Sequence, residues 1–130
     1  MVSCMEIKVI TEQAEERERL KHIAYVEEIK EKTRQYCSTK LSEILKAEAD
    51  KPSHVAVIYT SRYPNVDGIV HFVEKDSETS NYYSEVSTLC HLDTLVKFTE
   101  EHGFTVTVID DTRAYNSRRT INVKRVSIRW

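Results

Sequence analysis

The sequence predicts an α+β fold, a mainly antiparallel sheet of about five strands with helices packed on one side. Three observations predict it. A stretch without Gly or Pro up to residue 50 carries apolar residues at helical spacing. Runs rich in β-branched and aromatic residues follow, and one further helical segment, 89–102, interrupts them. At 130 residues, with 40% hydrophobic and 31% charged side chains, the chain fits one domain, 1–130.

The N-terminal third predicts a short strand and then a long helix. Apolar and charged residues alternate over 5–11, which is typical of a strand, and Thr11 is the predicted N-cap of the helix that follows. That helix is either a single one of about 35 residues or a pair that breaks near 37–40. Pro52 marks its end, because proline cannot continue a helix.

The middle of the chain predicts a hairpin. Residues 54–60 and 69–75 are apolar, β-rich runs, and the segment 62–68 between them has turn chemistry. Residues 76–81 are a predicted polar loop, and 82–88 is ambiguous, with a third strand as one interpretation.

The C-terminal part predicts a helix and two more strands. Residues 89–102 place apolar side chains on one helical face, and Gly103 is a suitable C-terminal stop. Residues 104–110 alternate cleanly, as a strand does. A loop over 111–117 and a long terminal strand over 118–130 complete the predicted order.

The terminal strand carries apolar residues on both parities. Ile121 and Val123 share one parity, while Val126, Ile128 and Trp130 share the other. A β-bulge near Lys124–Arg125 would bring all five to one buried face, so a bulge is predicted there.

Charge is segregated along the chain. The whole chain has a formal net charge of −2, yet residues 112–130 hold six of its nineteen basic residues and no carboxylate. Residues 51–111, in contrast, carry a net charge of −6. The terminal segment is therefore the chemically most unusual part of the sequence.

The Arg-rich terminal hairpin (104–130) predicts a non-enzymatic binding protein for an anionic partner, such as a nucleotide-like or phosphorylated ligand or a nucleic-acid backbone. Guanidinium groups give paired, charge-assisted donors to phosphates, and an aromatic ring stacks on a base. The candidate ligand-binding residues are Arg113, Tyr115, Arg118, Arg119, Lys124, Arg125 and Arg129. In the alternative interpretation these cations protect an edge strand or pair with the protein's own carboxylates.

Two other functions compete with anion binding. The apolar stripe of the long helix, over 19–45, suits a protein–protein interaction module, an adaptor or inhibitor, and homodimerisation through this helix. Asp110 and Asp111 are a weaker indication of a metal-dependent hydrolase, because Glu74 and Lys75 on the predicted strand 69–75 are adjacent and form no carboxylate–x–Lys triplet.

Neither a cofactor nor a metal is expected. The sequence has no paired metal-ligand spacing and no glycine-rich phosphate loop. Cys4, Cys37 and Cys90 are odd in number and unrelated in spacing, which favours reduced thiols in a cytoplasmic protein, with the latter two as small core residues on helices. We expect no signal peptide and no membrane-spanning segment.

Overall fold

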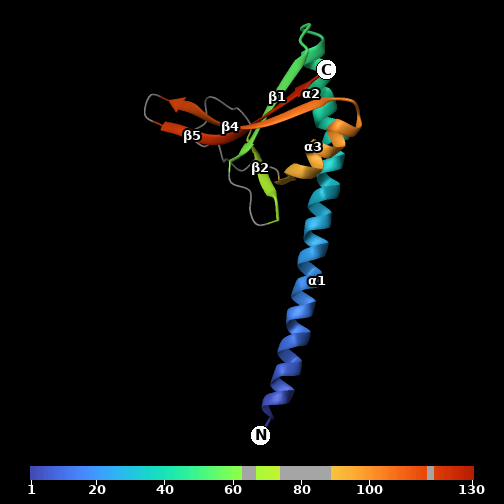
Figure 1. Ribbon diagram of the computed structural model, residues 1–130, viewed down its shortest axis with the longest axis vertical. Helices are drawn as coiled ribbons and strands as arrows, with labels where there is room; N and C mark the ends of the chain where they lie inside the picture. The colour runs from blue at the N-terminus through green and yellow to red at the C-terminus, as the bar shows by residue number, and fades with distance from the viewer. Residues whose placement is uncertain (63–66, 74–88, 117–118) are drawn as a thin grey trace.

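The computed structural model describes residues 1–62, 67–73, 89–116 and 119–130, and over 112–121 what it describes is the backbone (Figure 1). The elements are α1 (Cys4–Tyr36), the π-helical turn η1 (Cys37–Leu41), α2 (Ser42–Ala49), β1 (Val55–Ser61), β2 (Ile69–Val73), β3 (Leu89–His91), α3 (Leu92–Glu101), β4 (Thr105–Asn116) and β5 (Arg119–Arg129). The predicted α+β class is confirmed. The polar loop and the ambiguous strand predicted over 76–88 lie outside the described residues.

The five described strands form one sheet in the order β3-β2-β1-β5-β4, and every neighbouring pair is antiparallel. The predicted hairpin of 54–60 and 69–75 is confirmed as β1 and β2, with Tyr59 opposite Val73. β5 is an interior strand next to the edge strand β4, because β1 pairs with one side of it and β4 with the other.

The predicted strand over 5–11 is wrong, because these residues belong to α1. The helix begins at Cys4, and the Ser3 hydroxyl accepts a hydrogen bond from the Glu6 amide at 3.2 Å. Ser3 is therefore the N-cap, and the predicted cap at Thr11 is wrong too. A helix satisfies its own backbone groups, whereas a strand needs a neighbour, so a seven-residue alternation does not by itself decide for a strand.

The helical column runs from Cys4 through η1 to Ala49 without an end, so the predicted break near 37–40 is a π-helical turn instead. A π-turn widens the helix and changes which amide each carbonyl meets. Hydroxyl groups bind the carbonyls around it: Thr39 Oγ1 donates to Gln35 O at 2.7 Å, and Ser42 Oγ donates to Cys37 O at 2.8 Å. The polar segment 37–40 thus marks a change of helical pitch.

The core lies between one face of the sheet and the helices (Figure 1). Its fully or nearly fully buried members are Cys37, Leu41, Ile58, Val70, Phe72, Cys90, Leu95, Val126 and Ile128. The helical column contributes through η1, and α3 contributes through Leu95. The helices therefore cover one side of the sheet, as predicted.

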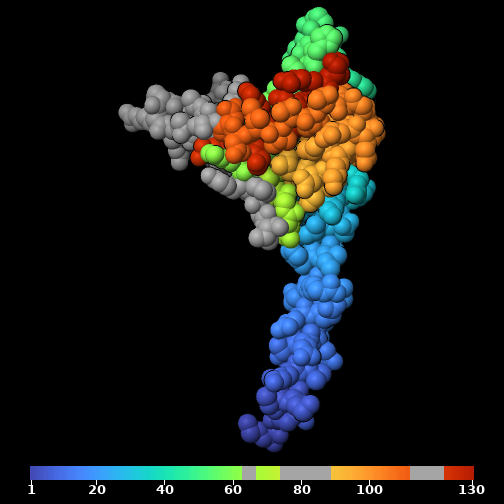
Figure 2. All heavy atoms as spheres, in the orientation of Figure 1, coloured from blue at the N-terminus to red at the C-terminus, as the bar shows by residue number. Residues whose placement is uncertain are grey.

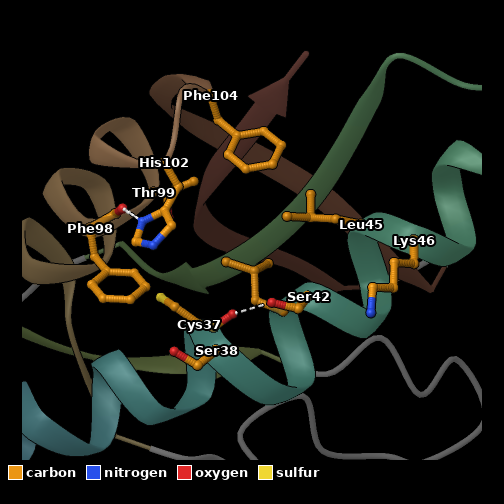
Figure 3. A pocket seen from close by; sticks show the side chains of 10 residues that line it. Cys37, Ser38, Ser42, Leu45, Lys46, Phe98, Thr99, His102 and Phe104 are labelled. Atoms are coloured by element: carbon orange, nitrogen blue, oxygen red, sulfur yellow. Dashed lines mark hydrogen bonds between the residues drawn. The ribbon is translucent and has the colours of Figure 1, made fainter.

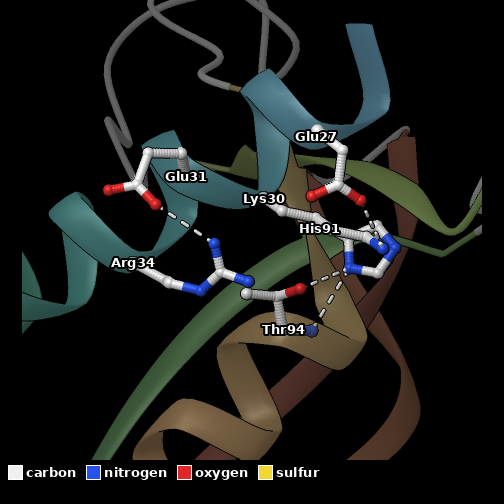
Figure 4. A network of polar contacts seen from close by, with 6 residues as sticks. All are labelled: Glu27, Lys30, Glu31, Arg34, His91 and Thr94. Atoms are coloured by element: carbon white, nitrogen blue, oxygen red, sulfur yellow. Dashed lines mark hydrogen bonds and ion pairs between the residues drawn. The ribbon is translucent and has the colours of Figure 1, made fainter. Parts of the chain in front are cut away.

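A polar contact joins α1 to the residue before α3, and Figure 4 shows the side chain of that residue, His91, with Thr94 next to α1. The His91 amide donates to Thr33 Oγ1 at 2.9 Å, and this hydroxyl donates in turn to Ile29 O at 2.8 Å. His91 also caps α3, since its Nδ1 accepts a hydrogen bond from the Thr94 amide at 3.3 Å. The predicted helix 89–102 consequently starts at Leu92, and the three residues before it form β3 beside β2.

The first part of α1 projects from the sheet and the other helices as a rod (Figures 1 and 2). Where the rod meets the domain, His22 Nε2 lies 2.8 Å from Asp67 Oδ1. Among the described residues, nine of the twelve exposed large apolar side chains lie within residues 1–25. None of the described helices is long and apolar enough to cross a bilayer.

The terminal hairpin differs from its prediction in two ways. β4 continues to Asn116, so the loop predicted over 111–117 is for the most part strand. The register of β5 against β1 and β4 is unbroken through Lys124 and Arg125, so the predicted bulge is wrong, and the irregularity lies between Ala114 and Asn116.

Without that bulge, the apolar residues of β5 lie on two faces. Val126 and Ile128 belong to the core under the helices, whereas Val123, equally buried, points to the opposite face. Ile69 and Val73 are buried on that opposite face as well. Apolar residues of β5 are therefore buried on both faces of the sheet, and no bulge is required to bury them.

Candidate functional site

The β4–β5 hairpin extends beyond the rest of the sheet (Figure 1). β1 pairs with β5 only from Val123 to Arg129, whereas β4 and β5 remain paired up to Asn116 and Arg119. We call the described backbone outside the β1 pairing, 112–116 and 119–122, the ribbon. Its sequence contains Arg113 and Arg119 and no carboxylate, and Arg118 adjoins it.

The base of the ribbon contains an ion-pair cluster centred on Asp110. Lys124 Nζ lies 3.2 Å from Asp110 Oδ1, and Arg62 Nε lies 3.5 Å from Asp110 Oδ2. The hydrogen bond from Lys124, with the positive charges of both partners, lowers the pKa of the Asp110 carboxyl below its usual value. For Lys124, pairing with the protein's own carboxylate is therefore what the structure shows.

Arg125 and Arg129 lie on the other face of β5 from Lys124, because side chains alternate along a strand. Arg129 is exposed, at the end of the sheet far from the ribbon. Arg125 is half-buried, and its Nε is a buried donor that has no hydrogen-bond partner among the described residues.

The seven predicted residues therefore do not form one surface. Those whose side chains the structure describes are divided between the two faces of β5: Lys124 on one, Arg125 and Arg129 on the other. The side chains of Arg113, Tyr115, Arg118 and Arg119 lie outside the described part.

The geometry does not favour a metal site at Asp110 and Asp111. As successive residues in the regular part of β4, they point to opposite faces of the sheet. No group of three or more His, Cys, Asp or Glu side chains within the described ranges is arranged to hold a metal ion.

A second site is a pocket between η1, α2 and α3, which the sequence did not predict (Figure 3). It has a volume of about 400 Å³, and its lining residues are Cys37, Ser38, Leu41, Ser42, Leu45, Lys46, Phe98, Thr99, His102 and Phe104. Two segments far apart in the chain form it, so no local pattern reveals it. The one local signal is the polar run Ser38, Thr39 and Lys40, which interrupts the apolar pattern of the helix.

The buried thiols are predicted to be unreactive. Burial raises the pKa of Cys37, and it raises the pKa of Cys90 to about 12, so both stay protonated at neutral pH, while Cys4 is exposed. At pH 8 the folded protein should take up one iodoacetamide group, on Cys4, and the denatured protein three. Mass spectrometry of intact and digested protein checks this. Rapid labelling of Cys90 in the folded state would contradict the packing described above.

Comparison of the chain with protein-family models, with curated proteins and with solved structures finds no match.

Proposed function

We propose that the protein is a non-enzymatic binding module that recognises an anionic partner through the ribbon. The partner class is a phosphorylated or nucleotide-like ligand or a nucleic-acid backbone. One observation carries the proposal: β4 and β5 continue as a separate pair beyond β1, and their sequence there is rich in arginine and free of carboxylates. A two-stranded ribbon fits a nucleic-acid groove, and guanidinium groups bind phosphates with paired donors.

The charge distribution supports a local site on a protein of formal net charge −2. Lys124 and Arg62 share the single carboxylate of Asp110 at the base of the ribbon, and Arg113, Arg118 and Arg119 add three positive charges to a segment whose sequence has no carboxylate. A local cationic field attracts anions over about 8–10 Å at moderate salt. Binding through it should accordingly be modest and salt-sensitive.

Fluorescence anisotropy with a labelled DNA duplex, at increasing salt, tests the proposal, with inorganic triphosphate as competitor. We expect a log–log salt slope of about −3 if three arginines each neutralise one phosphate. Asp110→Asn should tighten binding and steepen the slope, because it removes a negative charge at the base of the ribbon and releases Lys124 from its ion pair. Glu28→Gln is the matched control, since it removes the same charge from an ion pair with Lys32 on α1. If neither the DNA duplex nor the inorganic triphosphate binds at low salt, the proposal is excluded.

The exposed rod favours a second candidate function, a protein–protein interaction module acting through α1, with a second copy of the chain as the partner. Met5, Val9, Leu20 and Ile23 are all exposed, and their spacings place them on one face of α1. Most helical stability in proteins comes from packing of an apolar face, so covering this face stabilises the rod. Two-fold pairing is the simplest arrangement that covers it.

Light scattering of the double variant Val9→Glu, Leu20→Glu tests this pairing. We expect the wild type to have twice the mass of the variant, because two charges on this exposed helical face oppose its burial in a dimer. Thr11→Glu is the control, since Thr11 lies on the other side of the helix and should leave the mass unchanged. A wild type that stays monomeric at high concentration would rule out self-association.

A cytoplasmic location fits both candidate functions. The three cysteines of the chain are free, and the two buried ones are protected by packing rather than by a disulfide. Proteins of this kind suit a reducing compartment.

A further inference from the structure

The pocket beside η1 has two walls, the helical column on one side and α3 with the residues after it on the other (Figure 3). Its apolar lining consists of Leu41 and Leu45 on the helical column, with Phe98 and Phe104 on the other wall. Its polar groups come from Ser38, Ser42, Lys46 and His102. A mostly apolar cavity of about 400 Å³ with a few polar groups is typical of a small-molecule site, since such sites are about 300–1,000 Å³ in volume.

The π-turn shapes the first wall. η1 inserts an extra residue into the helical turn, and both Cys37 and Leu41 are buried there. The Ser42 hydroxyl donates a hydrogen bond to Cys37 O at 2.8 Å. Its proton therefore stabilises the turn and is not available to a ligand. π-turns inside long helices are frequent at functional sites, and this one lines the pocket.

His102 is oriented by the protein. Its Nδ1 lies 2.8 Å from Phe98 O, and because a carbonyl only accepts, Nδ1 carries the proton. The imidazole is tilted against the Phe98 ring, with 4.5 Å between the ring centroids. The second nitrogen, Nε2, is therefore held in one direction at the border of the pocket (Figure 3).

The charge of the lining is one-sided. Lys46 contributes a fixed positive charge and His102 a basic imidazole, while no Asp or Glu is among the described lining residues. Other lysines on or just after the helical column, Lys30, Lys32 and Lys51, each have a carboxylate partner three or four residues away. A ligand with one negative charge complements such a lining.

We propose that this pocket binds a small amphiphilic carboxylate, with its flat apolar body between Phe98 and Phe104 and its carboxylate toward Lys46. The site is separate from the ribbon and does not depend on the function proposed for it. Binding is non-covalent, because the one thiol in the lining, Cys37, is buried against the protein.

Two-dimensional amide NMR with 3-phenylpropionate and its uncharged amide, 3-phenylpropanamide, tests the proposal. We expect both to shift peaks of 37–46 and 98–104, with the acid binding about three- to fivefold tighter, as an exposed ion pair provides. Lys46→Gln should remove that difference while the amide still binds. Lys32→Gln, which lies outside the pocket and pairs with Glu28, should preserve it.

Ser38→Trp places a large ring at the border of the pocket and should abolish binding of both compounds. Equal affinity of the wild type for acid and amide would overturn the proposed carboxylate, and shifts spread over the rod instead of the pocket would overturn the site. A ribbon variant lacking its arginines should bind the acid as the wild type does, which separates this test from that of the proposed function.

Discussion

Replacing Arg113, Arg118 and Arg119 together by glutamine is expected to reduce the affinity for duplex DNA at low salt by at least about tenfold and to flatten its salt dependence by nearly three units. The reason is the counterion release that each guanidinium causes at a phosphate. These three arginines lie in or next to the ribbon, which no third strand covers among the described residues. Anisotropy titrations at several salt concentrations measure both quantities.

A control with the same change in net charge is available on α1. Arg17→Gln, Lys21→Gln and Lys32→Gln remove three positive charges at a distance from the ribbon. If binding followed only the net charge of the protein, both triple variants would lose equal affinity, and the ribbon would not be the site. Equal melting temperatures of the ribbon variant and the wild type would show that the loss is not one of folding.

Leu95→Ala is expected to lower the free energy of unfolding by about 2–5 kcal/mol. Leu95 is fully buried in the core cluster, where α3 meets η1 and the sheet. Removal of its side chain leaves a cavity that the neighbouring strands and the helical column cannot fill without moving. Urea denaturation followed by circular dichroism measures the change.

Ile10→Ala is the matched control for that variant. Ile10 is 57% exposed on the rod, and alanine is the better helix former, so a change within about 0.5 kcal/mol is expected. A loss at Leu95 no larger than the change at Ile10 would mean that α3 is not packed on the sheet as described.

Local patterns in the sequence predicted most of the elements, because helix and strand periodicity follow from the chain alone. The long helix, the β1–β2 hairpin and the helix before Gly103 were all predicted, although α1 begins at Cys4 instead of after Thr11 and α3 begins at Leu92 instead of residue 89. The strand at 5–11 was not, since seven alternating residues suit either structure and the Ser3 cap decided for the helix. Alternation alone cannot tell a strand from the start of a helix.

The sequence predicted the candidate site as a cluster of basic residues. It did not predict that these residues are divided between the two faces of β5. Counting residues shows that 112–130 is basic, but only the register shows that Lys124 meets Asp110 across the sheet while Arg125 faces the other way. The predicted bulge had assumed a single buried face. Burial of Val123 on the second face made it unnecessary.

The sequence by itself determined the α+β class, the long helix and the concentration of arginine near the C-terminus, because each depends on residues adjacent in the chain. Only the tertiary structure decided which cations are paired, how far the ribbon projects, and that residues 37–46 and 98–104 enclose a pocket. These features depend on contacts between segments distant in sequence. Such contacts arise from packing and strand register, which local patterns do not encode.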